Sequence, residues 1–156
     1  MANKAVIGGI SAAVLALAGG LIVKWEGKRY LPYRDAVGVW TVCVGHTGPD
    51  VKPGREYTED ECDALLTQDM AEANADVKRC IPVPLLPQIE AALTSATFNI
   101  GSRVVCGSTL QERALANDWP GACAQLDRWK YGGGRVLRGL ELRRADERRL
   151  CETGKN

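Results

Sequence analysis

The sequence contains few aromatic residues, a single histidine and little excess charge of either sign. Aromatic side chains make up 6% of the 156 residues, and His46 is the one histidine. No two cysteines have the Cys-x-x-Cys spacing typical of zinc-binding loops, and one histidine is too few for a usual metal cluster. The formal net charge is only +1, which gives no strong attraction for nucleic acid. We therefore expect no metal, no cofactor and no nucleic-acid partner.

Internal repeats and low-complexity linkers are also absent. With 46% hydrophobic and 25% charged residues, the composition is that of a globular protein and excludes a disordered or fibrous chain. The length suits one compact domain with a hydrophobic core. We expect this domain to span residues 25–156 and to be a monomer.

Cysteine is missing from the first 42 residues but abundant after them. The six cysteines are Cys43, Cys62, Cys80, Cys106, Cys123 and Cys151. An even number without metal-site spacing favours three disulfides, and therefore a body that lies in an oxidising compartment. The spacing alone does not choose among the possible pairings.

An uncharged segment of 19 residues, 5–23, lies between Lys4 and Lys24. As a helix rising about 1.5 Å per residue, it is just long enough to cross a hydrocarbon core of about 30 Å. It is rich in glycine and alanine and has no aromatic residue, so it would be a weak anchor. Three interpretations remain open at this point: a signal peptide cleaved at Ala16-Leu17-Ala18, a permanent anchor, or an anchor that inserts and later leaves. The flanking positive charges alone do not place the body outside the cytoplasm, but we give the cysteines more weight.

The remaining pattern predicts a mainly helical body. Residues 37–44 alternate and are rich in β-branched side chains, which indicates a strand. Thr58 and Glu61 form a capping box that begins a helix running to about Arg79. Further helices are expected at about residues 88–99, 109–117, 118–129 and 140–151. The sum is an α+β fold with one small antiparallel sheet.

Two acidic residues near the end of the apolar segment are candidate catalytic groups. Glu26 follows Trp25 and precedes Gly27, so its carboxyl is expected to be partly desolvated and to retain a proton, as a general acid requires. Asp35 lies in a polar turn, where it would stay ionised. Two carboxyl groups in unlike environments are the minimum for glycoside hydrolysis. However, two acids this close often occur by chance, so the residues alone do not establish catalysis.

A longer motif surrounds these acids. Asp35 follows Glu26 after eight residues, Thr41 follows Asp35 after five, and Gly-His-Thr-Gly occupies 45–48. Together these positions resemble the catalytic region of phage lysozymes of glycoside hydrolase family 24. Similar matches at Gln68-Asp69, in the segment 92–101 and at the C-terminal end extend the resemblance from Trp25 to Cys151.

The resemblance implies a two-lobed lysozyme-like fold and an enzyme that needs no cofactor. Its substrate would be the glycan strands of peptidoglycan, cut at the β-1,4 bond between N-acetylmuramic acid and N-acetylglucosamine. Glu26 would protonate the glycosidic oxygen, Asp35 would support the water or the oxocarbenium-like state, and Thr41 would position the water. The implied reaction inverts the sugar, for which the two carboxyl groups should lie about 6.5–9.5 Å apart.

Other residues receive roles from the same resemblance. His46 is expected to form a structural ion pair with Asp69 rather than to act as a base. Phe98 is expected in the core, with one edge that could reach the substrate. Arg143 and Arg144 are expected to tie down the last helix. For the cysteines our hypothesis is Cys43–Cys62, Cys80–Cys106 and Cys123–Cys151, which would join neighbouring elements.

The weakly apolar N-terminal segment resembles that of signal-anchor-release endolysins of lambdoid-type phages. Cleavage after Ala18 would remove most of the helix expected before Glu26, which favours release over cleavage. Residues 1–24 would then tether an inactive enzyme on the periplasmic side of the host inner membrane, and the released protein would act in the periplasm. This implies a functional link to a holin or pinholin. Because the segment has no cysteine, activation by disulfide exchange with the anchor is excluded.

Two alternatives remain. A lytic transglycosylase would use Glu26 without needing Asp35 or Thr41. A non-catalytic, membrane-tethered protein that binds the cell wall would need none of the three, and their joint presence argues against it.

Overall fold

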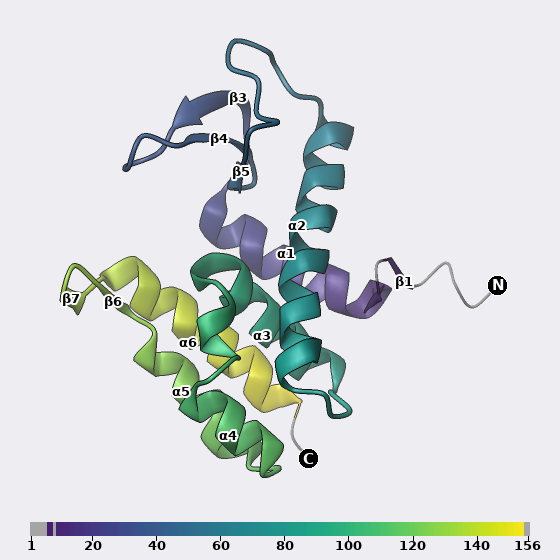
Figure 1. Cartoon of the computed structure of the whole chain (residues 1–156), viewed down its shortest axis with the longest axis vertical. Coiled ribbons are helices and arrows are strands. Elements are labelled where there is room, and N and C mark those ends of the chain that lie inside the picture. The colour runs from purple at the N-terminus through teal and green to yellow at the C-terminus, as the bar shows by residue number, and fades with distance from the viewer. Residues whose placement is uncertain (1–5, 8, 155–156) are drawn as a thin grey trace.

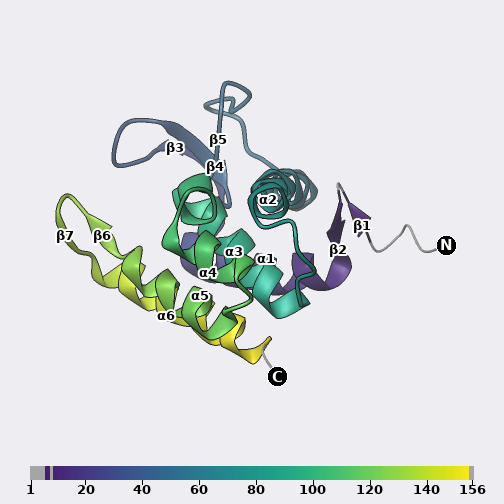
Figure 2. The ribbon, with the colours of Figure 1, turned by 60° about the horizontal axis from the view of Figure 1, so that its bottom comes forward.

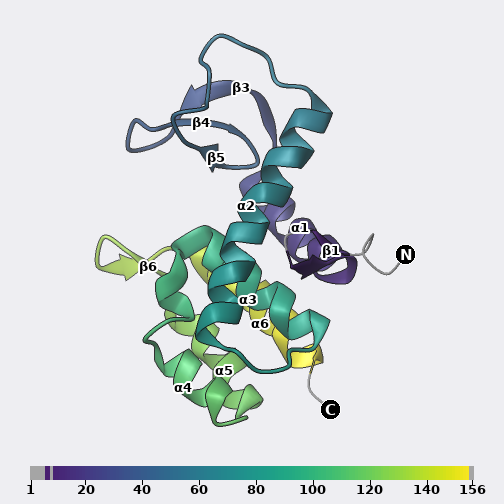
Figure 3. The ribbon, with the colours of Figure 1, turned by 45° about the vertical axis from the view of Figure 1, so that its right-hand side comes forward.

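The computed structural model describes residues 6–7 and 9–154. Figure 1 shows a small sheet at one end of the molecule and a group of helices at the other, joined by the long helix α2 (Glu59–Cys80). Figure 3, turned about the vertical axis, shows the same division, with α2 running from the sheet into the helices. The fold is therefore mainly helical and two-lobed.

The elements follow the expected order with different bounds. The helices are α1 (Ala12–Glu26), α2, α3 (Pro87–Ile100), α4 (Thr109–Leu115), α5 (Trp119–Gln125) and α6 (Arg138–Thr153), with 3₁₀ turns η2 (Ser102–Val104) and η3 (Leu126–Arg128). The strands are β1 (Val6–Ile7), β2 (Ile10–Ser11), β3 (Arg29–Arg34), β4 (Trp40–Cys43), β5 (His46–Thr47), β6 (Tyr131–Gly132) and β7 (Arg135–Val136).

The expectation of a single small sheet is wrong. The strands form three antiparallel sheets: β1–β2, β3–β4–β5 and β6–β7. The two additional sheets are hairpins whose strands have two residues each. A hydrophobic alternation cannot be recognised over two residues, so no sequence pattern predicts these hairpins. The three-stranded sheet is the one expected from residues 37–44.

The expected helix over 5–23 begins later than its apolar composition indicates. Helix α1 starts at Ala12, where the side chain of Ser11 accepts a hydrogen bond from Val14 N at 3.3 Å. The strands β1 and β2 occupy part of the preceding segment, and residues 5 and 8 lie outside the described part of the chain. Among the described residues, no helix is both long and apolar enough to cross a membrane.

Helix α1 packs within the body along one stripe. Val14, Ala18 and Ile22, each four residues apart, are at most 1% exposed. They share a hydrophobic cluster with side chains from α2 and α3, including Leu66 and Met70. A stripe at this spacing is what a helix presents to a core. The segment expected to precede the domain is therefore an integral part of its packing in this structure.

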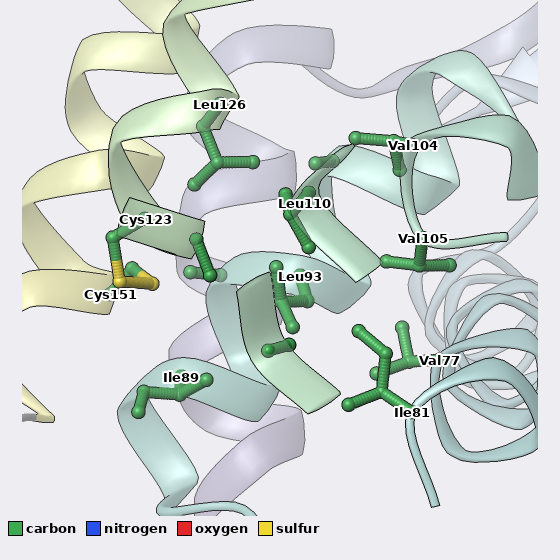
Figure 4. Packing of buried hydrophobic residues seen from close by; sticks show 14 residues of the cluster. Val77, Ile81, Ile89, Leu93, Val104, Val105, Leu110, Cys123, Leu126 and Cys151 are labelled. Atoms are coloured by element: carbon green, nitrogen blue, oxygen red, sulfur yellow. A yellow bond between two sulfur atoms is a disulfide. The ribbon is translucent and has the colours of Figure 1, made fainter. Parts of the chain in front are cut away.

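The helical lobe has its own core around α3. Figure 2 views α2 nearly end-on and shows α3 between α2 and α6. Leu93 of α3 is fully buried, and Figure 4 shows it among Ile81, Leu110 and other apolar side chains from the surrounding helices. This packing fixes α6 relative to α2 and α3.

All three hypothesised disulfides are present. They are Cys43–Cys62, Cys80–Cys106 and Cys123–Cys151, with Cα–Cα distances of 5.0, 5.3 and 5.7 Å. The first joins β4 to α2, the second joins the end of α2 to the segment after η2, and the third joins α5 to α6 (Figure 4). The separation of each Cα pair is in the usual range for a disulfide.

Candidate active site

Glu26 is the last residue of α1. The helix ends here because Gly27 adopts a left-handed conformation, φ 71°, and its N–H donates to Val23 O at 2.9 Å. Glycine adopts this conformation at little cost. The Glu26 side chain is 26% exposed, and its Oε1 accepts a hydrogen bond from Arg143 Nη1 at 2.7 Å. The carboxylate is thus held at the point where α1 meets α6.

The turn between β4 and β5 approaches Glu26 from another direction. A Cβ atom on Gly45 would lie 3.2 Å from Glu26 Oε2, and Gly45 has φ 67°. Any side chain here would crowd the carboxylate and strain the backbone. Three segments distant in sequence therefore meet at Glu26: the end of α1, the β4–β5 turn and α6.

Asp35 lies at the tip of the hairpin formed by β3 and β4. Its Oδ1 accepts hydrogen bonds from Val37 N at 2.9 Å and Val39 N at 2.8 Å. Its own backbone N–H donates to Val39 O at 2.9 Å, and its carbonyl accepts from Gly38 N at 3.0 Å. Backbone donors to one carboxylate oxygen fix the orientation of the group. The hairpin therefore presents a half-buried carboxylate in a defined direction.

Thr41 lies on β4, the central strand of the sheet. It pairs with Tyr33 of β3 and Thr47 of β5, and it is only 4% exposed. Its Oγ1 donates to Val39 O at 3.1 Å. Val39 thus contacts both candidates, giving its N–H to Asp35 and its carbonyl to Thr41. The hydroxyl hydrogen of Thr41 is used in this bond, so its oxygen can accept a hydrogen bond from another donor.

His46 forms the expected contact with Asp69. Its Nδ1 lies 2.8 Å from Asp69 Oδ2, and its Nε2 lies 3.0 Å from Asp50 Oδ2. Burial lowers the pKa of His46, but its hydrogen bonds with Asp69 and Asp50 outweigh burial and raise that pKa above the ordinary 6.5. Burial also raises the pKa of Asp69, against the opposing effect of His46. Both ring nitrogens are engaged, and the histidine connects β5 to α2.

A hollow of about 280 Å³ adjoins this region, between the sheet lobe and helices α2 and α3. Gly45 and Thr47 line it on one side, and Phe98 with Thr97 of α3 lines another. Asp69, Glu72 and Asp76 of α2 give it an acidic wall. Phe98 is half-buried and also packs against the cluster that contains α1. Phe98 therefore lines the same hollow as Gly45, the glycine beside the Glu26 carboxylate.

A larger hollow of about 490 Å³ lies on the helical lobe, where Arg103, Arg128 and Trp129 contribute to its lining. None of the three candidate catalytic residues lines either hollow. We place the chemistry beside the smaller one because Gly45, which lines it, lies next to the Glu26 carboxylate.

Two residues of α6 that contact the end of α1 did not emerge from the sequence as site residues. Arg143 was expected only to tie down its helix, but its guanidinium binds Glu26 and also lies 3.4 Å from Glu147 Oε1. Asp146, one turn later, binds Lys24 and Trp25. The one sequence signal for Arg143 is its place in the C-terminal stretch 139–147 that resembles the family, and no sequence signal points to Asp146. Arg144 does have the expected structural role: its Nη2 donates to Asn99 Oδ1 of α3 at 2.8 Å, and it also pairs with the fully buried Glu147 of its own helix at 2.7 Å.

Comparison with known proteins gives the same family as the sequence motifs, over most of the chain. Residues 23–147 match the family described as phage lysozyme. The chain is 41% identical over 158 aligned positions to the SAR-endolysin of Enterobacteria phage P21, covering 97% of this chain and 96% of that protein. It is 42% identical to the SAR-endolysin of Bacteriophage PS119, covering 98% and 95%. The crystal structure of the active form of P1 phage endolysin Lyz aligns with a TM-score of 0.78 at 27% identity, covering 92% of this chain and 93% of that one.

The matched family covers the end of α1 with Glu26, the sheet with Asp35 and Thr41, and α6 through Glu147. The whole candidate site therefore lies within it. This chain belongs to the phage lysozyme family.

Proposed function

We propose that this protein is a muramidase that cuts the β-1,4 bond between N-acetylmuramic acid and N-acetylglucosamine in peptidoglycan. The observation that carries the proposal is the position of Glu26. Its carboxylate is fixed by Arg143 on one oxygen, and the other oxygen lies beside a glycine at the edge of an open hollow. Family membership supports the same chemistry.

In this proposal Glu26 is the general acid. Arg143 holds Oε1, so Oε2 carries the proton that is transferred to the glycosidic oxygen as the bond to the sugar breaks. Gly45 leaves space beside Oε2. A positioned acid of this kind contributes about 100-fold to 10,000-fold to a rate.

Asp35 and Thr41 act on the water. The water oxygen bonds to the anomeric carbon, and Asp35 accepts the proton that the water loses. Thr41 accepts a hydrogen bond from the water, because its own hydrogen is donated to Val39 O. A water held on the opposite face from Glu26 inverts the sugar, which is the outcome we expect.

The proposal includes control by the membrane. Residues 1–24 would serve as a signal-anchor-release segment and residues 25–156 as the muramidase domain. While the segment is in the host inner membrane, Glu26 would be separated from Arg143 on α6. Release to the periplasm, triggered by a holin or pinholin that depolarises the membrane, would let α1 pack on the body. The similarity to SAR-endolysins supports this order of events.

Digestion of purified peptidoglycan tests the activity. We expect the wild-type chain to release fragments with reducing ends and Glu26→Gln to release almost none. Glu141→Gln is a matched control, because Glu141 lies on the exposed side of α6 and pairs with Arg138. Products ending in anhydro sugars would instead identify a lytic transglycosylase. Wild-type chain that binds peptidoglycan without cutting it would leave only the non-catalytic alternative.

Lysis of intact cells tests the control by the membrane. Cells expressing the full chain should remain intact until an uncoupler is added and then lyse, whereas cells with Glu26→Gln should survive. Lysis without the uncoupler would favour a cleaved signal peptide. A chain that stays in the membrane fraction after the uncoupler would indicate a permanent anchor.

A further inference from the structure

The end of α1 is bound to α6 at two places, one helical turn apart on α6. Arg143 binds Glu26, as described above. Three residues later, Asp146 Oδ2 accepts hydrogen bonds from Lys24 Nζ at 2.6 Å and from Trp25 Nε1 at 3.0 Å. Three consecutive residues of α1 are therefore held by two side chains of α6.

The Asp146 carboxylate is held in one orientation by its surroundings. Its side chain is only 10% exposed, although Lys24 is 60% exposed. Its other oxygen, Oδ1, is bound by Arg149 of the same helix. Hydrogen bonds from cations to a carboxylate are shorter and stronger than neutral ones. Asp146 thus has donors on both oxygens, and those on Oδ2 come from the residues directly before Glu26.

The buried stripe of α1 fixes the rotation of most of the helix, but the stripe ends at Ile22, so a contact at Glu26 alone would leave the last turn free to fray. Successive residues of an α-helix are separated by about 100° around the axis, so Lys24, Trp25 and Glu26 project in three different directions. Binding Lys24 and Trp25 as well as Glu26 holds this last turn of α1 in its helical conformation against α6.

We propose that Asp146 is a positioning residue for Glu26. It holds the end of α1 against α6, so that the Glu26 carboxylate stays between Arg143 and Gly45 in the orientation that proton transfer needs. Asp146 acts through the helix and does not touch the substrate. This inference rests on the proposed function, since it assigns a role in that reaction.

The first test compares Asp146→Ala with Asp127→Ala. Asp127 also pairs with an α6 arginine, Arg148, which in turn pairs with Glu152 of the same helix. With purified peptidoglycan, we expect Asp146→Ala to lower kcat about 10-fold to 100-fold and to leave KM within about twofold, because a small displacement of a catalytic group costs rate rather than affinity. Asp127→Ala should keep kcat within about twofold. An unchanged kcat in Asp146→Ala, or an equal loss in both variants, overturns the proposal.

Variants on α1 give a second test that does not depend on the folding of Asp146→Ala. Trp25→Phe removes the indole donor together with part of the ring, and Lys24→Met removes the ammonium group but keeps an unbranched chain. Each should lower kcat in the same direction, and adding Asp146→Asn should cost less than the separate effects predict, because the changes disrupt one contact. Fully additive effects would overturn the proposal. If the wild-type chain itself fails to cut peptidoglycan, the proposed function fails first, which separates the two outcomes.

Discussion

Arg143 Nη1 lies 2.7 Å from Glu26 Oε1, so a buried guanidinium on the last helix holds the candidate acid at the end of the first. We expect Arg143→Lys to lower kcat on peptidoglycan about 100-fold, because lysine keeps the charge but cannot reproduce the geometry of the guanidinium. Arg148→Lys on the same helix is the control, and it should stay near wild-type activity. Equal rates for the two variants would show that the contact with Glu26 is dispensable.

A substitution at Gly45 tests whether crowding of Glu26 Oε2 lowers activity. Gly45→Ala and Gly54→Ala both place alanine at a left-handed position, with φ 67° and 80°, but only the first brings a Cβ near Glu26. Both should lower the free energy of unfolding by about 1–2 kcal/mol. Only Gly45→Ala should also lower kcat, by about 10-fold or more, because displacing the acid costs rate. Urea unfolding and peptidoglycan digestion measure the two effects separately, and a similar fall in kcat for Gly54→Ala would contradict this explanation.

The part of the site that the sequence predicts well is the part formed by neighbouring residues. Asp35 and Thr41 lie on one hairpin, where short spacing and strand alternation determine their relation, and Val39 between them joins both. The contact of Glu26 with Arg143 spans 117 positions, and that of Trp25 with Asp146 spans 121. These contacts depend on how α6 packs against the body, which no local pattern encodes.

The start of α1 could not be predicted from the sequence, for a different reason. Residues 5–23 have a nearly uniform apolar composition, so hydropathy indicates no boundary within them. The helix begins at Ala12 because Ser11 caps it, a single side-chain contact inside an otherwise featureless segment. Composition predicted an apolar segment leading into Glu26, but the buried stripe of Val14, Ala18 and Ile22 required the structure.

His46 makes stability depend on pH. Its pKa is raised above 6.5 in the folded protein by Asp69 and Asp50, so the folded state holds the proton more tightly than the unfolded chain. The resulting stabilisation is fully present below the unfolded pKa of about 6.5 and is lost as the pH rises through the folded pKa. We expect His46→Asn to lose more stability relative to wild type at about pH 5.5 than at about pH 9.

Urea unfolding of both proteins at the two pH values measures this difference. No other histidine is present in the sequence, so a histidine-dependent change in the difference between the two free energies of unfolding can be assigned to His46. If the difference in free energy of unfolding between the two proteins is constant, or larger at the higher pH, the ion pair of His46 does not stabilise the fold.

Substitutions at Ile22 and Val23 distinguish the contribution of α1 packing from that of its hydrophobicity. They are adjacent apolar residues in the proposed anchor, but Ile22 is fully buried and Val23 is 37% exposed. We expect Ile22→Ala to lower the free energy of unfolding by about 2–5 kcal/mol, because it leaves a cavity between α1 and its neighbours. Val23→Ala should cost no more than about 0.5 kcal/mol. Urea unfolding of the purified chains measures both values.

The same pair then tests whether packing of α1 on the body controls lysis. Both substitutions reduce the apolar character of the segment in a similar way, so both should weaken the hold of the membrane to a similar extent. Only Ile22→Ala weakens the contact that α1 makes after release. Lysis after an uncoupler should therefore be slower with Ile22→Ala than with Val23→Ala. If the two variants lyse cells at the same rate despite different stabilities, packing of α1 does not limit activation, and departure from the membrane is the controlling step.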